Sequence, residues 1–122
     1  MRTHIVHPGE EPLRLGALAT VLEGARLLAL RSWHPDRYDI YHCAQRAWRA
    51  QNTPVPYAAI TYQLRRLVVD GNLLAYNDTQ CHSRVEMADL YAAARDNVLR
   101  QYNLAQQPTT GAPAGPRLAA TA

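Results

Sequence analysis

The chain has 122 residues, of which 48% are hydrophobic and 19% are charged, so it can bury the core of one ordinary domain. Its formal net charge of +3, carried by arginine without any lysine, permits contact with an acidic polymer but does not require it. Two cysteines, Cys43 and Cys81, are too few for a disulfide-built scaffold, and charges interrupt the most apolar run, Leu13 to Leu30. We therefore expect a cytoplasmic protein without a membrane span and without a signal peptide.

The first half of the chain predicts an arm and two helices. Residues 1–12 contain Pro8, Gly9 and Pro12 and are expected to form a flexible arm. A helix over 13–32 follows from apolar residues that share one face: Leu15, Leu18, Leu22, Ala25 and Ala29. Pro35 should then break the chain, and Asp36 is expected to cap a second helix over 37–51. The buried face of that helix is predicted to hold Ile40, Ala44, Ala47 and Trp48.

The second half predicts two more helices around a β-hairpin. A third helix over 56–70 ends before Gly71, with Ile60, Leu64, Leu67 and Val68 facing the core. Residues 73–76 and 81–87 are predicted to pair as strands around the turn 77–80, because Cys81, Ser83, Val85 and Met87 alternate with polar residues. A fourth helix over 87–102 has an apolar stripe, and residues 104–122 are predicted to be a disordered tail.

The segment from Ile60 to Leu74 resembles the third helix and wing of winged-helix transcriptional regulators of the penicillinase-repressor and PadR types. In those families a helix of pattern L-x-x-L-x-x-x-G-x-[LI] leads directly into the wing, and Leu64, Leu67, Gly71 and Leu73 occupy these positions here. The resemblance covers residues 38–87. It implies a mainly α fold with a small β-hairpin, a winged helix-turn-helix over 13–103 with flanking N- and C-terminal helices.

The resemblance implies that the third helix reads DNA. Ala58 is small enough to let the backbone approach base edges, and Tyr62 can reach a phosphate or a thymine methyl. Arg65 and Arg66 can each present a planar fork to guanine or phosphate. Further candidate contacts are His82 and Arg84 on the predicted wing, and Arg46 and Arg49 on the exposed face of the second helix. The acidic wing tip departs from the basic wings of the family.

Catalytic and metal-binding functions find little support in the sequence. The pairs His42-Cys43 and Cys81-His82 have the composition of a zinc site, but adjacent residues point apart on a helix or a strand. Two buried free thiols are the favoured interpretation of the cysteines, with a redox disulfide as the alternative. No phosphate-binding loop or nucleophile motif is present, so we expect no enzyme activity, no metal and no cofactor.

These patterns predict a sequence-specific double-stranded DNA-binding protein that regulates transcription. We expect a homodimer that associates through the helices 13–32 and 87–102 and presents two reading helices to a palindromic site. The alternative is a winged-helix module that binds a protein, such as a phage or mobile-element inhibitor of a host complex. A third possibility is a structural subunit tethered by the proline-rich tail.

Overall fold

A computed structural model describes residues 10–106, and residues 1–9 and 107–122, which hold most of the predicted arm and tail, lie outside the described part. The five α-helices are α1 Glu10–Ser32, α2 Ile40–Gln51, α3 Tyr57–Arg65, α4 Leu73–Ala75 and α5 Arg84–Gln106. Two short helical turns, η1 Val69–Gly71 and η2 Tyr76–Gln80, flank α4. Within this part of the chain, no helix combines the length and apolar character needed to cross a membrane.

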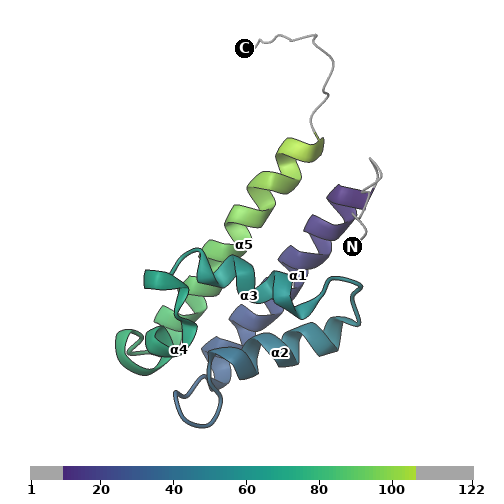
Figure 1. Cartoon of the computed structure of the whole chain (residues 1–122). Coiled ribbons are helices and arrows are strands. Elements are labelled where there is room, and N and C mark those ends of the chain that lie inside the picture. The colour runs from purple at the N-terminus through teal and green to yellow at the C-terminus, as the bar shows by residue number, and fades with distance from the viewer. Residues whose placement is uncertain (1–9, 107–122) are drawn as a thin grey trace, which may run out of the picture.

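Helices α1 and α5 are far apart in the sequence but lie side by side and antiparallel (Figure 1). We call this pair of helices the α1–α5 hairpin. Their direction follows from two contacts, since Glu23 near the middle of α1 meets Arg95, and the carbonyl of Trp33 just after α1 meets Arg84 at the start of α5. The predicted stripe of α1 is confirmed, because all five of its residues are buried. The apolar faces of α1 and α5 thus pack against each other within one chain. Any association of two copies has to use outward-facing side chains, such as Leu27 and Leu30.

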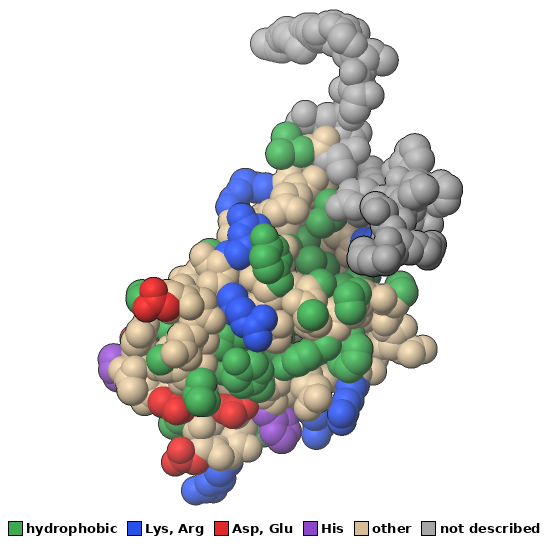
Figure 2. Space-filling view, in the orientation of Figure 1, with side chains coloured by type: hydrophobic (Ala, Val, Ile, Leu, Met, Phe, Trp, Pro, Cys, Tyr) green, Lys and Arg blue, Asp and Glu red, His purple; other side chains and the backbone are tan. Residues whose placement is uncertain are grey.

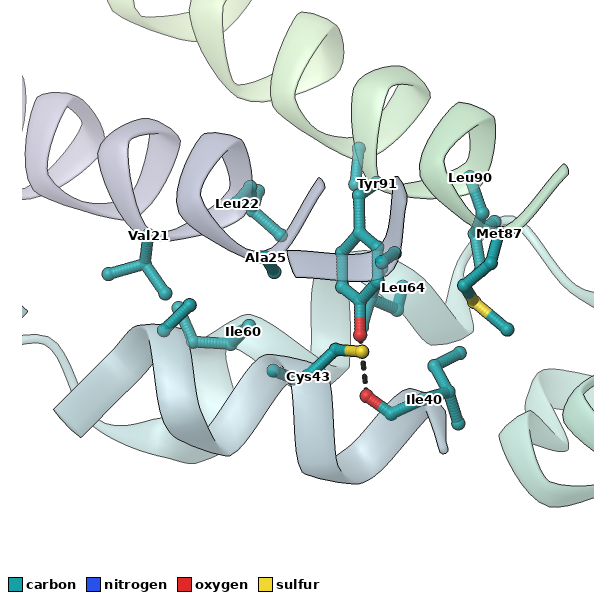
Figure 3. Packing of buried hydrophobic residues seen from close by; sticks show 14 of the residues in the cluster. Val21, Leu22, Ala25, Ile40, Cys43, Ile60, Leu64, Met87, Leu90 and Tyr91 are labelled. Atoms are coloured by element: carbon teal, nitrogen blue, oxygen red, sulfur yellow. Dashed lines mark hydrogen bonds between the residues drawn. The ribbon is translucent and has the colours of Figure 1, made fainter. Parts of the chain in front are cut away.

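Helices α2 and α3 complete the core by packing on the hairpin (Figure 3). Ile40 and Cys43 of α2, and Ile60 and Leu64 of α3, are fully buried. Tyr91 points from α5 toward α2 and donates its hydroxyl hydrogen bond to the carbonyl oxygen of Ile40. This contact links the middle of the hairpin to the first turn of α2.

Helix α2 begins three residues later than predicted, because Asp39 rather than Asp36 is its N-cap. The Asp39 Oδ1 accepts a hydrogen bond of 2.8 Å from the backbone N–H of His42 and so satisfies a donor of the first helical turn. His34 and Tyr38 exchange backbone hydrogen bonds of 3.0 Å and close a short loop between α1 and α2. Asp36 lies within that loop.

The predicted β-hairpin is absent from residues 10–106, and the winged-helix assignment is therefore wrong. The first predicted strand is instead the helical turn α4, which Asn72 caps by accepting a hydrogen bond of 2.9 Å from the N–H of Ala75. The predicted turn is the π-helical η2, which contains the buried side chain of Asn77. The Asn77 Oδ1 accepts hydrogen bonds from the Trp33 indole at 2.8 Å and from the N–H of Ile40 at 3.0 Å. This segment is therefore held to the rest of the fold by the long-range hydrogen bonds of Asn77 and not by the backbone hydrogen bonds of a β-hairpin.

The second predicted strand belongs largely to α5. The Ser83 hydroxyl accepts a hydrogen bond of 3.1 Å from the N–H of Glu86, whose carboxylate accepts one of 2.7 Å from the N–H of His82. This arrangement resembles a capping box, which favours the start of a helix. Cys81 and Met87 are buried, but Ser83 and Val85 are exposed, so the alternation did not mark a half-buried strand.

Helix α3 ends at Arg65, five residues before the predicted end. Val68 has extended backbone angles, and Asp70 and Gly71 adopt the left-handed conformation with φ of 57° and 65°. The β-branched pair Val68 and Val69 weakens helix propensity at this point. Leu67, predicted to face the core, consequently lies 37% exposed.

Candidate nucleic-acid interface

The connection between α2 and α3 is held by side chains of both helices. Asn52 ends α2 in the left-handed conformation, and the Trp48 indole of α2 donates a hydrogen bond of 2.6 Å to the carbonyl oxygen of Val55 in the connection. The Tyr57 hydroxyl of α3 donates one of 3.3 Å to the carbonyl oxygen of Tyr41. Burial raises the pKa of Tyr57 to about 12, so this hydroxyl keeps its proton at neutral pH. These bonds fix α3 against α2.

One face of α3 remains open to solvent. Ala58, Tyr62 and Arg65 lie one turn apart along the helix and are all exposed, whereas Ile60 and Leu64 on the opposite face are fully buried. Tyr62 is 57% exposed. The predicted division of this helix into a core face and an exposed face is therefore confirmed for these residues.

Arg66 follows α3 directly and contacts Tyr62. Its guanidinium carbon lies 5.7 Å from the centroid of the Tyr62 ring, which is within the range of a cation–π contact. Such a contact restricts the rotamers of a long side chain without neutralising its charge. Arg66 is exposed, so its positive charge remains accessible at the end of α3.

A second exposed stripe lies on α2. His42, Arg46 and Arg49 are spaced by four and three residues, so they share one face of the helix, and all three are exposed. His42 also stacks on Tyr38, with ring centroids 4.3 Å apart. The sequence had marked Arg46 and Arg49 as candidate contacts, and the structure leaves both available.

The charges on these two helices are of one sign. The stretch from Ile40 to Val69 contains four arginines and no Asp or Glu. In the described part of the chain, none of these arginines forms an ion pair, whereas Arg26 and Arg95 of the α1–α5 hairpin are paired. Figure 2 shows basic side chains over α3 and beside α2 on one face, with acidic side chains toward the left and lower left. The two helices thus present unneutralised positive charge to solvent.

The structure does not place His82 and Arg84 on a wing. His82 precedes α5, and its Nδ1 lies 3.7 Å from the carboxylate of Glu86. Arg84 is the first residue of α5, and its Nε donates a hydrogen bond of 3.1 Å to the carbonyl oxygen of Trp33. Both are exposed, but they belong to the hairpin and not to the α2–α3 pair.

The two cysteines are buried and unpaired, in agreement with the favoured interpretation of the sequence. Burial raises the pKa of Cys43 to about 12 and raises that of Cys81, so both thiols disfavour the reactive thiolate form. Among residues 10–106, no group of His, Cys, Asp or Glu side chains has an arrangement that could hold a metal ion.

The lack of carboxylates between Ile40 and Val69 is a signal that the sequence analysis missed, although it is visible in the sequence. The spacing of Tyr62 and Arg66 by four residues likewise indicated a side-chain contact on a helix. No protein-family model, curated protein or solved structure matches this chain.

Proposed function

We propose that this protein binds double-stranded DNA through the surface formed by α2 and α3. We call this surface the α2–α3 face, and its members are Arg46, Arg49, Ala58, Tyr62, Arg65 and Arg66. The observation that carries the proposal is a set of exposed arginines that form no ion pair within residues 10–106, in a stretch without any carboxylate. Arginines of this kind bind phosphates and release condensed counterions, which drives association with a duplex. Phosphate contacts of this kind supply affinity, and a regulator of transcription needs base contacts in addition.

The side chains of the α2–α3 face and the size of α3 favour binding to a duplex over binding to a single strand. Single-strand binding relies on several aromatic platforms for unstacked bases, but Tyr62 is the one aromatic member of this face. Trp48 and Tyr57 are half-buried and use their polar atoms within the α2–α3 connection. Helix α3 has nine residues, and an α-helix with its side chains is about 10–12 Å in diameter, which fits the ~12 Å width of the DNA major groove.

A salt titration tests the proposal directly. The affinity of the full chain for a mixed-sequence duplex is measured by fluorescence anisotropy at several salt concentrations. If all four arginines contact phosphates, the slope of log affinity against log salt is about −3.6, equivalent to a roughly 150-fold loss between 50 and 200 mM. Absence of binding to any duplex would overturn the proposal and leave an acidic protein surface as the partner of this face.

A matched pair of double variants locates the binding surface. Arg65→Ala with Arg66→Ala removes two charges from the α2–α3 face, and we expect the salt slope to become shallower by about 0.9 for each of them that contacts a phosphate. Arg31→Ala with Arg37→Ala removes two exposed charges elsewhere and should leave the slope within about 0.5 of that of the parent. Equal effects of the two double variants would show that net charge, rather than this face, controls binding.

A further inference from the structure

We infer that Tyr62 and Arg66 act as one reading unit that selects a guanine next to a thymine on one strand of the duplex. This inference rests on the proposed function and assigns sequence selectivity to two members of the α2–α3 face. The remaining arginines of the face then supply affinity by contacting phosphates.

The geometry of the pair supports this assignment. The Arg66 guanidinium lies 5.7 Å from the centroid of the Tyr62 ring, and no other arginine of the face has a ring contact in the described residues. An arginine packed on a ring loses fewer rotamers when it binds, because part of its freedom is already restricted. Its planar fork matches the O6 and N7 acceptors of guanine, which is the commonest base-specific contact of this side chain.

The position of Tyr62 relative to Arg66 indicates which base Tyr62 contacts. Residues four apart on a helix have Cβ atoms about 5–6 Å apart, whereas successive bases of one strand are about 3.4 Å apart along the duplex axis. Side chains of this spacing reach adjacent or next-adjacent bases. Tyr62 stays 57% exposed beside Arg66, and this leaves apolar ring surface for the C5-methyl group of thymine.

Arg46 and Arg49 have a different environment. They project from α2 as exposed charges, and within residues 10–106 neither has an ion pair or a cation–π contact like that of Arg66. A mobile charge of this kind binds a phosphate equally well in any sequence. Arg46 is therefore the control residue for affinity without selectivity.

In vitro selection from a randomised duplex library tests the inference, with binding of the selected duplexes measured by anisotropy. We expect the parent to enrich a thymine–guanine step, and each wrong base at this step to weaken binding by roughly 5-fold to 100-fold. Tyr62→Ala should lose the preference for thymine, whereas Tyr62→Phe keeps the ring and should keep it. Arg66→Lys keeps the charge but loses the fork, so it should retain the salt slope and lose the preference for guanine.

Arg46→Ala should weaken binding to all duplexes by a similar factor and leave the enriched step unchanged. The inference is wrong if the parent enriches no step, if it enriches a different one, or if Tyr62→Ala and Arg66→Lys retain the thymine and guanine preferences. Steep salt dependence without any enrichment would overturn the reading unit but keep the proposed function. Absence of duplex binding by the parent would overturn both.

Discussion

The α1–α5 hairpin and the α2–α3 face use the same residue type in opposite ways. In the hairpin, both carboxylate oxygens of Glu23 accept hydrogen bonds from Arg26, at 2.7 and 2.8 Å, and one of them also accepts from Arg95. On the α2–α3 face, arginines have no carboxylate within their own stretch of sequence and form no ion pair with the described residues. The contrast is that Arg26 and Arg95 both bind Glu23, which joins α5 to α1, whereas the arginines of the α2–α3 face make no ion pair within residues 10–106.

The largest effect on duplex affinity is expected when all four arginines of the α2–α3 face are replaced. The variant with Arg46, Arg49, Arg65 and Arg66 all replaced by Ala should lose at least roughly 100-fold in duplex affinity at 50 mM salt, because its phosphate contacts are gone. Its free energy of unfolding should stay within about 1 kcal/mol of the parent value, since exposed and unpaired side chains contribute little stability.

The comparison variant Arg26→Ala with Arg95→Ala should show the reverse pattern, with binding nearly unchanged and a small loss of stability, because both ion pairs with Glu23 are gone. Anisotropy and urea unfolding on the same samples provide both measurements. The distinction between the two regions fails if both variants lose binding equally.

The next largest effect concerns the contact that holds α2 in place. Asn77→Ala leaves the Trp33 indole N–H and the N–H of Ile40 without their acceptor, so we expect a loss of roughly 2–5 kcal/mol in the free energy of unfolding. Asn72→Ala removes a local cap of α4 and should cost about 1 kcal/mol. Equal losses in urea unfolding would mean that the long-range bonds of Asn77 contribute no more than a local cap.

A smaller effect is expected at the contact between the hairpin and α2. Tyr91→Phe keeps the fully buried ring and removes only the hydroxyl that bonds to the Ile40 carbonyl, so it should cost about 1 kcal/mol of unfolding free energy. Tyr62→Phe removes an exposed hydroxyl and should change stability by less than about 0.5 kcal/mol. If thermal and urea unfolding give the same value for both variants, the Tyr91 bond contributes no net stability.

The smallest effect is the pH dependence of the hairpin. Hydrogen bonds from Arg26 and Arg95 lower the pKa of Glu23 from 4.5 to about 2, with burial opposing them. A lowered folded-state pKa gives stability that is present above pH 4.5 and disappears as the pH falls toward 2. Glu23→Gln should therefore unfold more easily than the parent at pH 7, by less than about 1 kcal/mol, and match it near pH 2. A difference between the two proteins that does not change with pH would contradict this linkage.

Apolar periodicity predicted α1, α2 and α5 to within a few residues at each end, because each helix buries one face along most of its length. It failed between Val68 and Ser83, where the burial of Asn77 depends on partners about forty residues earlier in the chain. A local pattern does not contain such partners. The Ser83-x-x-Glu86 capping pattern is visible in the sequence at the start of α5, but the prediction rested on the strand alternation of the same residues.

More of the candidate site than of the region around it could be predicted from the sequence. The exposed positions of α3 follow from its helical period, so Ala58, Tyr62 and Arg65 were assigned to the correct face. His82 and Arg84 were misplaced because their role depended on a wing that does not form. The spacing of Tyr62 and Arg66 makes their contact possible, and the rotamers that place the guanidinium 5.7 Å from the ring centroid are known from the structure.

The long-range bonds of Asn77 also bear on the order in which the chain becomes functional during synthesis. The N–H of Ile40, at the start of α2, obtains its acceptor only after Asn77 has left the ribosome, and Tyr91, which bonds to the Ile40 carbonyl, emerges later still. A nascent or truncated chain that ends before these residues contains every arginine of the α2–α3 face but lacks the Asn77 and Tyr91 side chains that bond to Ile40. We therefore expect chains that end before Tyr91 to lack the long-range contacts that fix the start of α2.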